Sequence, residues 1–515
     1  MIMKFMQGFD RNQMQFFAYE QLISTDNDVR FIDAFVDSLN LTNCGFDMKF
    51  TNNGRPAYHP SELIKLYLYG YLNRIRSSRA LEKECARNIE VMWLLRGLTP
   101  DHNTISNFRR DNALAIRNVF RSTVCLGQNF DLIGGKLLAG DGTKLRAQNS
   151  KKNNFNQAKI DKHTAYIDRK LEEYNAMLSC EDGDHSNPEQ KKELTEKIAK
   201  QHERRKKYES LQEQLQTTGQ KQISTSDPDS RLLMLRNNIT EVAYNVQTTV
   251  DAKHCLCIDY KVTNQNDAHA MGDMLRMAKT ILKNNEFTAL YDKGYHTGSQ
   301  LAYADSLGIE TIVSIPATAS HAPDWNYDIQ HFIYNQQEDY YICPEGQTLS
   351  SNGKWYTKDR KSSSIKVKHY KTGKCLNCPV FGKCTKNKAG RLIERSQYQS
   401  NIDSNARRMD QNKQTYKRRQ AIVEHPFGIV KRQWDFYYIM TKKTIKRASA
   451  DVGLIFSAFN LRRIFNILDK NTLKAYLKAL AFIFRTCMTY FKPKSASLFF
   501  LPKYPTHFYP TQLTA

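Results

Sequence analysis

Three acidic residues stand at positions from which they could share one metal site. Asp141 and Asp292 each follow a short apolar run that predicts a strand, and each has a glycine one or two residues later, which lets the backbone turn. Glu424 lies on a predicted helix in the most basic part of the chain. Hard divalent cations bind carboxylate oxygens, and two such ions ~4 Å apart assist displacement at phosphodiesters in many nucleases. The three residues therefore predict a site for two Mg²⁺ or Mn²⁺ ions.

The same residue types also have a simpler interpretation. An aspartate that precedes a glycine at the end of a strand is commonly a turn residue. Asp251 and Asp267 also lie near predicted strand ends, and they are rivals for the metal site. Composition and spacing alone leave these alternatives open.

A second set of residues with metal-ligand chemistry is a group of cysteines. Four of the 11 cysteines lie within one short segment, namely Cys343, Cys375, Cys378 and Cys384. A Cys-x2-Cys pair can chelate one ion, and two further thiolates complete a tetrahedron. The surrounding residues bury little apolar surface, so a structural Zn²⁺ would hold the segment together. His369 is a rival ligand, and reduced free thiols are the alternative interpretation.

The charge of the chain points to a polyanionic partner. The sequence has 76 Lys and Arg against 52 Asp and Glu, a formal net charge of +24. Residues 350–400 carry 13 basic and 2 acidic residues, and residues 401–470 carry 15 and 6. A solvated basic face explains any single cluster, but this concentration predicts a surface that follows phosphates. DNA binding should then depend steeply on salt concentration.

Length and composition limit the class of protein. A chain of 515 residues is suited to about two to four domains, and 40% hydrophobic residues suffice for a folded core. No uncharged apolar run approaches ~18 residues, so we expect no membrane-spanning helix and no membrane partner. The first residues lack a secretory pattern, so we expect no signal peptide. The odd number of dispersed cysteines does not predict a disulfide framework. A reducing cytoplasm is the simplest compartment.

The first 130 residues predict helices, which must position two arginines. One helix is expected over Arg79–Leu95, after which Gly97 and Pro100 break the chain. Another helix begins near Asn103 and carries Arg109 and Arg110. This arrangement is compatible with a helix-turn-helix that contacts DNA, and plain helix packing is the alternative.

The remaining sequence predicts a mixed sheet with insertions. Strands followed by alternating strands and helices indicate an α+β or α/β fold. Residues 151–222 keep heptad-like spacing in two helical stretches, with 15 basic and 13 acidic residues, and are not the main DNA surface. The expected division is a helical DNA-binding domain (1–130), a first core part (131–316) with the helical hairpin 151–222, a Cys-rich basic insertion (317–400), C-terminal core helices (401–468) and a tail (469–515) with a packed or interface helix.

Three segments of the chain resemble the DDE transposases of bacterial insertion sequences, in particular the branch numbered 1182. The segments are LLAGDGTKLRA, ALYDKGYHTG and YKRRQAIVEHPFGIVKRQW, and the resemblance covers roughly residues 15 to 468. It implies a ribonuclease H-like mixed sheet with helices. It also implies that Asp141, Asp292 and Glu424 bind the catalytic metals.

The third segment is also similar to a Tyr, Arg, Glu and Lys signature of the wider family. The matching positions are Tyr416, Arg419, Glu424 and Lys431, although Arg and Glu are one residue further apart than in the pattern, so Arg418 is a rival. Seven residues make nearly two helical turns, which places Glu424 and Lys431 on one face. The predicted DNA contacts are Arg109, Arg110, Tyr416, Arg418, Arg419, Lys431 and Arg432.

The resemblance implies a function. The protein would bind the terminal inverted repeats of its element, cut DNA with metal-activated water and join the new end to target DNA. Joining two ends implies self-association in a synaptic complex, within the bacterial cytoplasm at the nucleoid. The alternative is a DNA-binding protein, derived from a transposase, that has lost catalysis, although all three carboxylates are present.

Overall fold

The computed structural model describes most of the chain. It covers residues 12–14, 16–48, 56–180, 188–235, 239–317, 322–360, 363–441, 443–469 and 471–479. The predicted tail helix is described only over 471–479, where Leu473 and Leu477 are buried, and the tail from residue 480 lies outside the described residues.

Helices alone form the described N-terminal part. Helix α4 is buried along most of its length; it begins at Pro60, whose missing N–H suits a first turn, and Nδ1 of His59 accepts from the backbone N–H of Ser61. The helices are α1 (Tyr19–Leu22), α2 (Asp28–Asp37), α3 (Leu41–Cys44), α4 (Pro60–Leu72), α5 (Ser78–Arg87), α6 (Ile89–Leu94), α7 (His102–Asp111) and α8 (Ala113–Asn129).

Two helix boundaries in this part differ from the sequence-based expectation. The single helix expected over Arg79–Leu95 is divided at Asn88, whose side chain caps α6 by accepting from the N–H of Glu90 at 3.0 Å. Helix α7 is capped by Asp101 rather than Asn103, because Asp101 accepts from two backbone N–H groups. Both differences come from a polar side chain that satisfies free N–H groups at a helix start.

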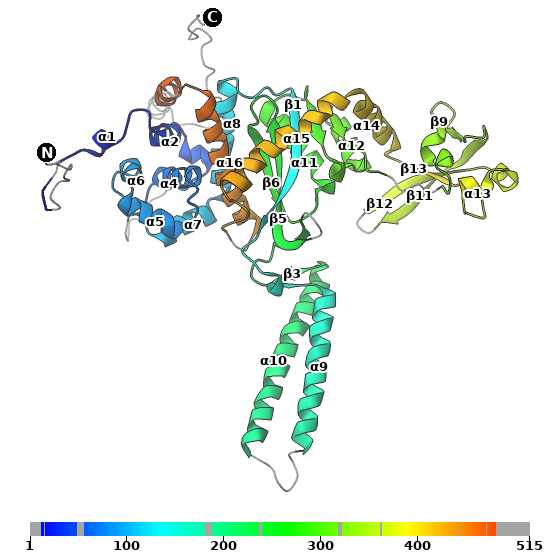
Figure 1. The fold of residues 1–515 in the computed structure, drawn as a ribbon, viewed down its shortest axis with the longest axis horizontal. Helices are drawn as coiled ribbons and strands as arrows, with labels where there is room; N and C mark the ends of the chain where they lie inside the picture. The colour runs from blue at the N-terminus through cyan, green and yellow to red at the C-terminus, as the bar shows by residue number, and fades with distance from the viewer. Residues whose placement is uncertain are drawn as a thin grey trace, which may run out of the picture.

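A mixed sheet forms the centre of the molecule (Figure 1). Its order is β4-β5-β1-β7-β8, and β6 pairs with the same strand β5. Strand β1 is antiparallel to β5 and parallel to β7, which is parallel to β8. The strands are β1 (Leu137–Arg146), β4 (Arg231–Met234), β5 (Thr240–Asp251), β6 (Cys257–Thr263), β7 (Thr288–Tyr291) and β8 (Glu310–Val313). The mixed α+β class expected from the sequence is confirmed.

Helices connect and cover this sheet. The 3-10 turn η3 (Asp267–His269) leads into α11 (Met271–Leu282), and η4 (Lys293–Tyr295) leads into α12 (Gly298–Ser306). Helix α16 (Ile445–Ile467) contacts β6 on one side and α4, α7 and α8 on the other. It therefore joins the N-terminal helices to the sheet in one continuous core (Figure 1).

A long pair of helices projects from the central body (Figure 1). Helix α9 (Gln157–Cys180) packs on α10 (Pro188–Thr218). At their base lie the turn η1 (Lys151–Asn153) and the short pair β2 (Asn154–Phe155) and β3 (Ile223–Ser224). A small apolar cluster lies at the base of the pair, made of Phe155, Ile160, Leu211 and Leu215. No described helix is long and apolar enough to cross a membrane.

A second sheet lies on the side of the molecule away from the N-terminal helices (Figure 1). Its order is β13-β12-β11-β10-β9, and every pairing is antiparallel. Its own core consists of Phe332, Tyr341, Leu349, Tyr370 and Ile393. Its elements are η5 (Trp325–Tyr327), η6 (Ile329–His331), β9 (Ile333–Asn335), β10 (Tyr340–Ile342), β11 (Thr348–Arg360), β12 (Ser363–Lys371), η7 (Gly373–Asn377), α13 (Phe381–Cys384) and β13 (Ile393–Ser396).

The chain then returns to the central sheet through α14 (Gln399–Gln411). The amide of Asn405 donates to the backbone oxygen of Val313 and accepts from its N–H, each at 2.9 Å, so it covers the end of β8. Helix α15 (Lys413–Gly428) crosses beside β1 and continues into η8 (Ile429–Gln433), a π turn. This return places the third acidic segment near the first.

Candidate active site

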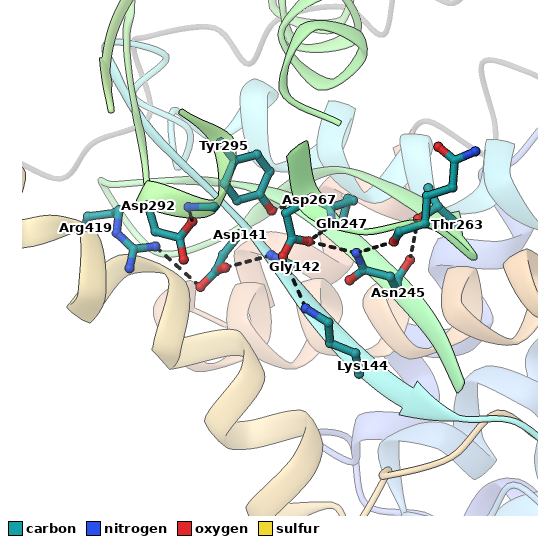
Figure 2. A network of polar contacts seen from close by, with 12 residues as sticks. Asp141, Gly142, Lys144, Asn245, Gln247, Thr263, Asp267, Asp292, Tyr295 and Arg419 are labelled. Carbon is teal, nitrogen blue, oxygen red and sulfur yellow. Dashed lines mark hydrogen bonds and ion pairs between the residues drawn. The ribbon is translucent and has the colours of Figure 1, made fainter. Parts of the chain in front are cut away.

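The strand register brings Asp141 and Asp292 together. Strand β7 pairs with only the first residues of β1, ending with Ala139 opposite Leu290. Continued by two residues, this register sets Asp141 opposite Asp292. Figure 2 shows both carboxylates on the same side of the sheet edge at which strand β7 ends beside β1. The two sequence-predicted aspartates therefore lie in one place.

Asp141 lies inside strand β1, not at its end as the sequence suggested. Gly142 continues the strand opposite Gln247 of β5. A Cβ built on Gly142 would lie 2.4 Å from Gln247 Nε2 and 2.5 Å from Asp267 Oδ1. The glycine is therefore needed for the close approach of polar side chains, and not for a turn.

Asp292 lies directly after β7 and caps the turn η4. Its Oδ1 accepts from the backbone N–H of Gly294 at 2.8 Å. Asp292 therefore follows a strand and begins a turn, as the sequence predicted. The carboxylate is oriented by its own turn, beside the edge that carries Asp141 (Figure 2).

Helix α15 supplies a cation to the same edge. Arg419 Nη1 lies 3.4 Å from Asp141 Oδ2, with side chains that are 16% and 24% exposed. The hydroxyl of Tyr416 donates to the backbone oxygen of Tyr291 at 3.2 Å, which fastens the helix to the end of β7. Arg418 is exposed. Of the two rival arginines, Arg419 is therefore the one that faces the aspartates.

The environment of Asp141 disfavours an uncompensated negative charge. Burial raises the pKa of Asp141 above its ordinary value, and the nearby Asp292 and Asp267 act in the same direction. Arg419 and the N–H of Gly142 oppose this shift. Carboxylates gathered in this way favour the presence of a cation.

Glu424 does not join the two aspartates in this structure. Its side chain is exposed, and its Oε1 accepts from Gln420 on the same helix at 3.0 Å. Among the residues that the structure describes, no group of three or more His, Cys, Asp or Glu side chains is arranged to hold a metal ion. The donor chemistry of Asp141 and Asp292 suits Mg²⁺, but the third predicted ligand faces elsewhere.

The expected shared face of Glu424 and Lys431 is wrong. Helix α15 ends at Gly428, and the following residues form a π turn, so the seven-residue spacing does not follow an α-helix. The ammonium of Lys431 donates to the backbone oxygen of Lys144 on β1 at 3.0 Å. Arg432 is exposed.

The expectation that Arg109 contacts DNA is corrected by its burial. Arg109 is 4% exposed; its guanidinium donates to the hydroxyl of Tyr71 at 2.8 Å and lies 3.5 Å from Asp451. It therefore packs inside the core, where a phosphate cannot reach it. Arg110 is exposed and pairs with Asp111 at 2.6 Å.

The rival aspartates have different positions. Asp251 is buried and accepts from the backbone N–H groups of Gly134, Gly135 and Lys253, so it is a turn residue. Asp267 lies in the polar network beside Asp141 (Figure 2).

The rest of that network was missed by sequence reasoning. It includes Lys144, Asn245, Gln247 and Tyr295 (Figure 2). A signal was present, because Asn245 and Gln247 are alternate polar residues on one face of a strand that is buried along most of its length.

The four cysteines line one small pocket of the second sheet's subdomain, beside Phe332 and Leu349. Cys343 Sγ accepts from the backbone N–H of Gln347 at 3.2 Å. Burial raises the pKa of the Cys384 thiol; the other three cysteines act in the same direction, and Arg391 opposes them. His369 instead stacks on Tyr356.

Two family models match the chain. A transposase domain of the DUF772 type matches residues 17–111, and a transposase DDE domain matches residues 342–465, which include Glu424 and the four cysteines. Together, the two matches support a DDE transposase of the insertion-sequence type. The resemblance seen in the sequence is confirmed at this level, whereas the 1182 branch stays a prediction.

Similarity to solved structures and to curated proteins is low. The chain is similar to the structure of a piggyBac transposase synaptic complex with hairpin DNA, with a TM-score of 0.30 and 8% identity, over 93% of this chain and 82% of that chain. Nothing is inferred from a similarity of this size. No curated protein matches the chain.

Proposed function

We propose that this transposase binds the terminal inverted repeats of its own element and catalyses metal-dependent cleavage and strand transfer of DNA. The observation that carries the proposal is the meeting of Asp141, Asp292 and Arg419 at one sheet edge in a chain of this family. We also assign the central sheet to the ribonuclease H-like type, because strand β1 is antiparallel to β5 and parallel to β7.

Asp141, Asp292 and Glu424 would hold two Mg²⁺ or Mn²⁺ ions. When bound, such ions neutralise charge at the attacking and leaving oxygens of a phosphodiester. Glu424 would have to exchange its contact with Gln420 for one at the sheet edge. Arg419 would then be released from Asp141 to bind a phosphate.

Exposed basic residues on the central body and on the N-terminal helices would hold the DNA backbone. Arg418 and Arg432 are exposed on and just after α15, and Arg110 is exposed on α7. Tyr416 would act by fixing α15 on the sheet. The net charge of +24 supports a polyanionic partner. We further propose self-association on two DNA ends, in the bacterial cytoplasm at the nucleoid.

The test uses a labelled duplex that carries the element's terminal repeat and its flank, with Mg²⁺, Mn²⁺ or EDTA. We expect salt-sensitive binding in all three conditions, and cleavage and joining only with metal. Asp141→Ala should abolish the chemistry and keep end binding, whereas Asp410→Asn, an exposed control, should keep both. Tight binding without chemistry in any metal would instead indicate an inactive DNA-binding protein.

We propose separately that Cys343, Cys375, Cys378 and Cys384 hold a structural Zn²⁺. Their support is the common pocket. The four thiolates would have to move closer together to surround one ion, because the described residues contain no such arrangement. Cys378→Ser should lower the zinc content on elemental analysis and destabilise the second sheet. Cys180→Ser, an exposed control, should change neither. Equal zinc content in the two variants, or its absence from the native protein, would disprove this site.

A further inference from the structure

Asp267 occupies the centre of the polar network beside the two aspartates (Figure 2). Its Oδ1 accepts from Asn245 Nδ2 at 2.8 Å and from Gln247 Nε2 at 2.6 Å. Its Oδ2 pairs with Lys144 Nζ at 3.2 Å. Both carboxylate oxygens are thus held by donors from two neighbouring strands.

These donors lie at the positions that fix Asp141. Lys144 is three residues beyond Asp141 on β1, and its partner in the register is Asn245 on β5. Two positions nearer to Asp141, Gly142 is paired with Gln247. Asp267 therefore clamps the pairing of β1 with β5 directly beside Asp141.

The same carboxylate is connected to the turn that carries Asp292. Gln247 Oε1 accepts from the buried hydroxyl of Tyr295 at 2.5 Å. The hydroxyl of Thr297 donates to the backbone oxygen of Ala268, next to Asp267, at 3.0 Å. Two links therefore join η3 to the segment at η4: one runs from Asp267 through Gln247 to Tyr295, and the other from Ala268 to Thr297.

We propose that Asp267 is a positioning residue of the active site. Its carboxylate holds strand β1 and the Asp292 turn in one arrangement, and so sets the geometry in which Asp141 and Asp292 present their oxygens to a divalent ion. This inference rests on the proposed function, because it assumes that the two aspartates bind metal. Residues that orient metal ligands typically change metal affinity by about 10- to 100-fold when they are replaced.

The experiment measures Mn²⁺ binding to the full-length protein by titration calorimetry, and Mg²⁺ dependence of DNA cleavage in parallel. Asp267→Ala should weaken Mn²⁺ binding by about tenfold and raise the half-maximal Mg²⁺ concentration similarly. End binding in EDTA should stay unchanged. Asp273→Asn changes a half-exposed aspartate paired with Lys261; it is the control and should behave as the native protein.

A second variant separates positioning from loss of folding. Lys144→Met keeps Asp267 and removes only one of its partners, so it should give a smaller shift in the same direction. If both variants bind Mn²⁺ as tightly as the native protein does, the inference is overturned and the proposed function stays intact. If the native protein binds Mn²⁺ but does not cleave DNA, the proposed function is refuted. The affinities of the two variants for Mn²⁺ would then still decide the inference. A native protein that binds no Mn²⁺ would refute both.

Discussion

Gly142 shows how tightly side chains converge next to Asp141. A side chain at this position would meet Gln247, Asp267 and Asn245 within 2.4 to 2.9 Å. All three belong to the polar network that joins β1 to β5, so the backbone cannot move away without breaking hydrogen bonds. The absence of a Cβ is thus a condition for the site.

Gly142→Ala should lower the free energy of unfolding by about 1–3 kcal/mol, because the added methyl overpacks the network. Denaturant titration measures this loss. Gly428→Ala is the matched control, since a Cβ there meets nothing within 4 Å. Equal stability of the two variants would show that the strands at Asp141 are not closely packed.

Arg419 and Arg418 are neighbours with different surroundings, which allows a paired test. Arg419→Ala should reduce DNA cleavage by about 10²-fold, because it removes the arginine that lies 3.4 Å from Asp141. Arg418→Ala should mainly weaken DNA binding and make its loss with salt less steep, because one phosphate contact fewer releases fewer counterions. Cleavage rates at saturating DNA measure the difference, and an equal effect of both changes would refute the assignment.

Among the elements, the second sheet depends on an ionised aspartate in its β9–β10 turn. Asp339 has a φ of 54° and accepts from the hydroxyls of Tyr334 and Tyr370 and from the ammonium of Lys368. Burial alone would raise the pKa of Asp339, but these hydrogen bonds lower it from 3.8 to about 2. The turn is therefore stabilised by the charged form.

This shift predicts a pH dependence for the sheet. Because the folded pKa lies below the unfolded value, the stabilisation is complete above about pH 4 and is lost as pH falls towards 2. Asp339→Asn should be less stable than the native protein at neutral pH, and the difference should shrink over that range. Thermal unfolding at several pH values measures it, and parallel curves would contradict the prediction.

Over the whole molecule, one buried carboxylate ties the N-terminal helices to the core. Asp451 of α16 is fully buried; it accepts from the hydroxyl of Tyr71 on α4 and from the N–H of Met440 at 2.8 Å. Arg76 and Arg109 each lie 3.5 Å from it. The two matched transposase domains thus share one polar junction.

Asp451→Ala should destabilise the protein by about 3–5 kcal/mol, because two buried guanidinium groups lose their counter-charge. Urea unfolding measures the change. Asp410→Ala breaks an exposed ion pair with Lys413 and should cost less than about 1 kcal/mol. A similar cost for both would mean that the junction does not hold the parts together.

Local pattern was enough to place Asp141 and Asp292 next to strands and to predict the mixed sheet. Short apolar runs before Asp141 and Asp292 predict strands whatever the rest of the chain does. The side of the sheet on which the two meet follows from parallel pairing of their strands. The family resemblance supported Glu424 as the third acidic residue, and it lies inside the matched DDE domain.

Tertiary contacts decided what the sequence could not predict. Arg109 resembles a surface cation on its helix, but its partner Asp451 lies 342 residues further along the chain. The π turn after Gly428 breaks the face expected for Lys431 without a local signal other than Pro426. The direction of the Glu424 side chain likewise depends on a helix register that spacing does not define.

The ion pair between Asp141 and Arg419 joins residues 278 positions apart, with both the projecting helices and the second sheet encoded between them. During synthesis, the ribosome therefore releases both aspartates long before the arginine that completes this edge. A nascent chain holds an unfinished site, and premature termination before residue 419 leaves a product that lacks it. The order of the gene thus delays assembly of the site until the projecting helices and the second sheet have also been synthesised.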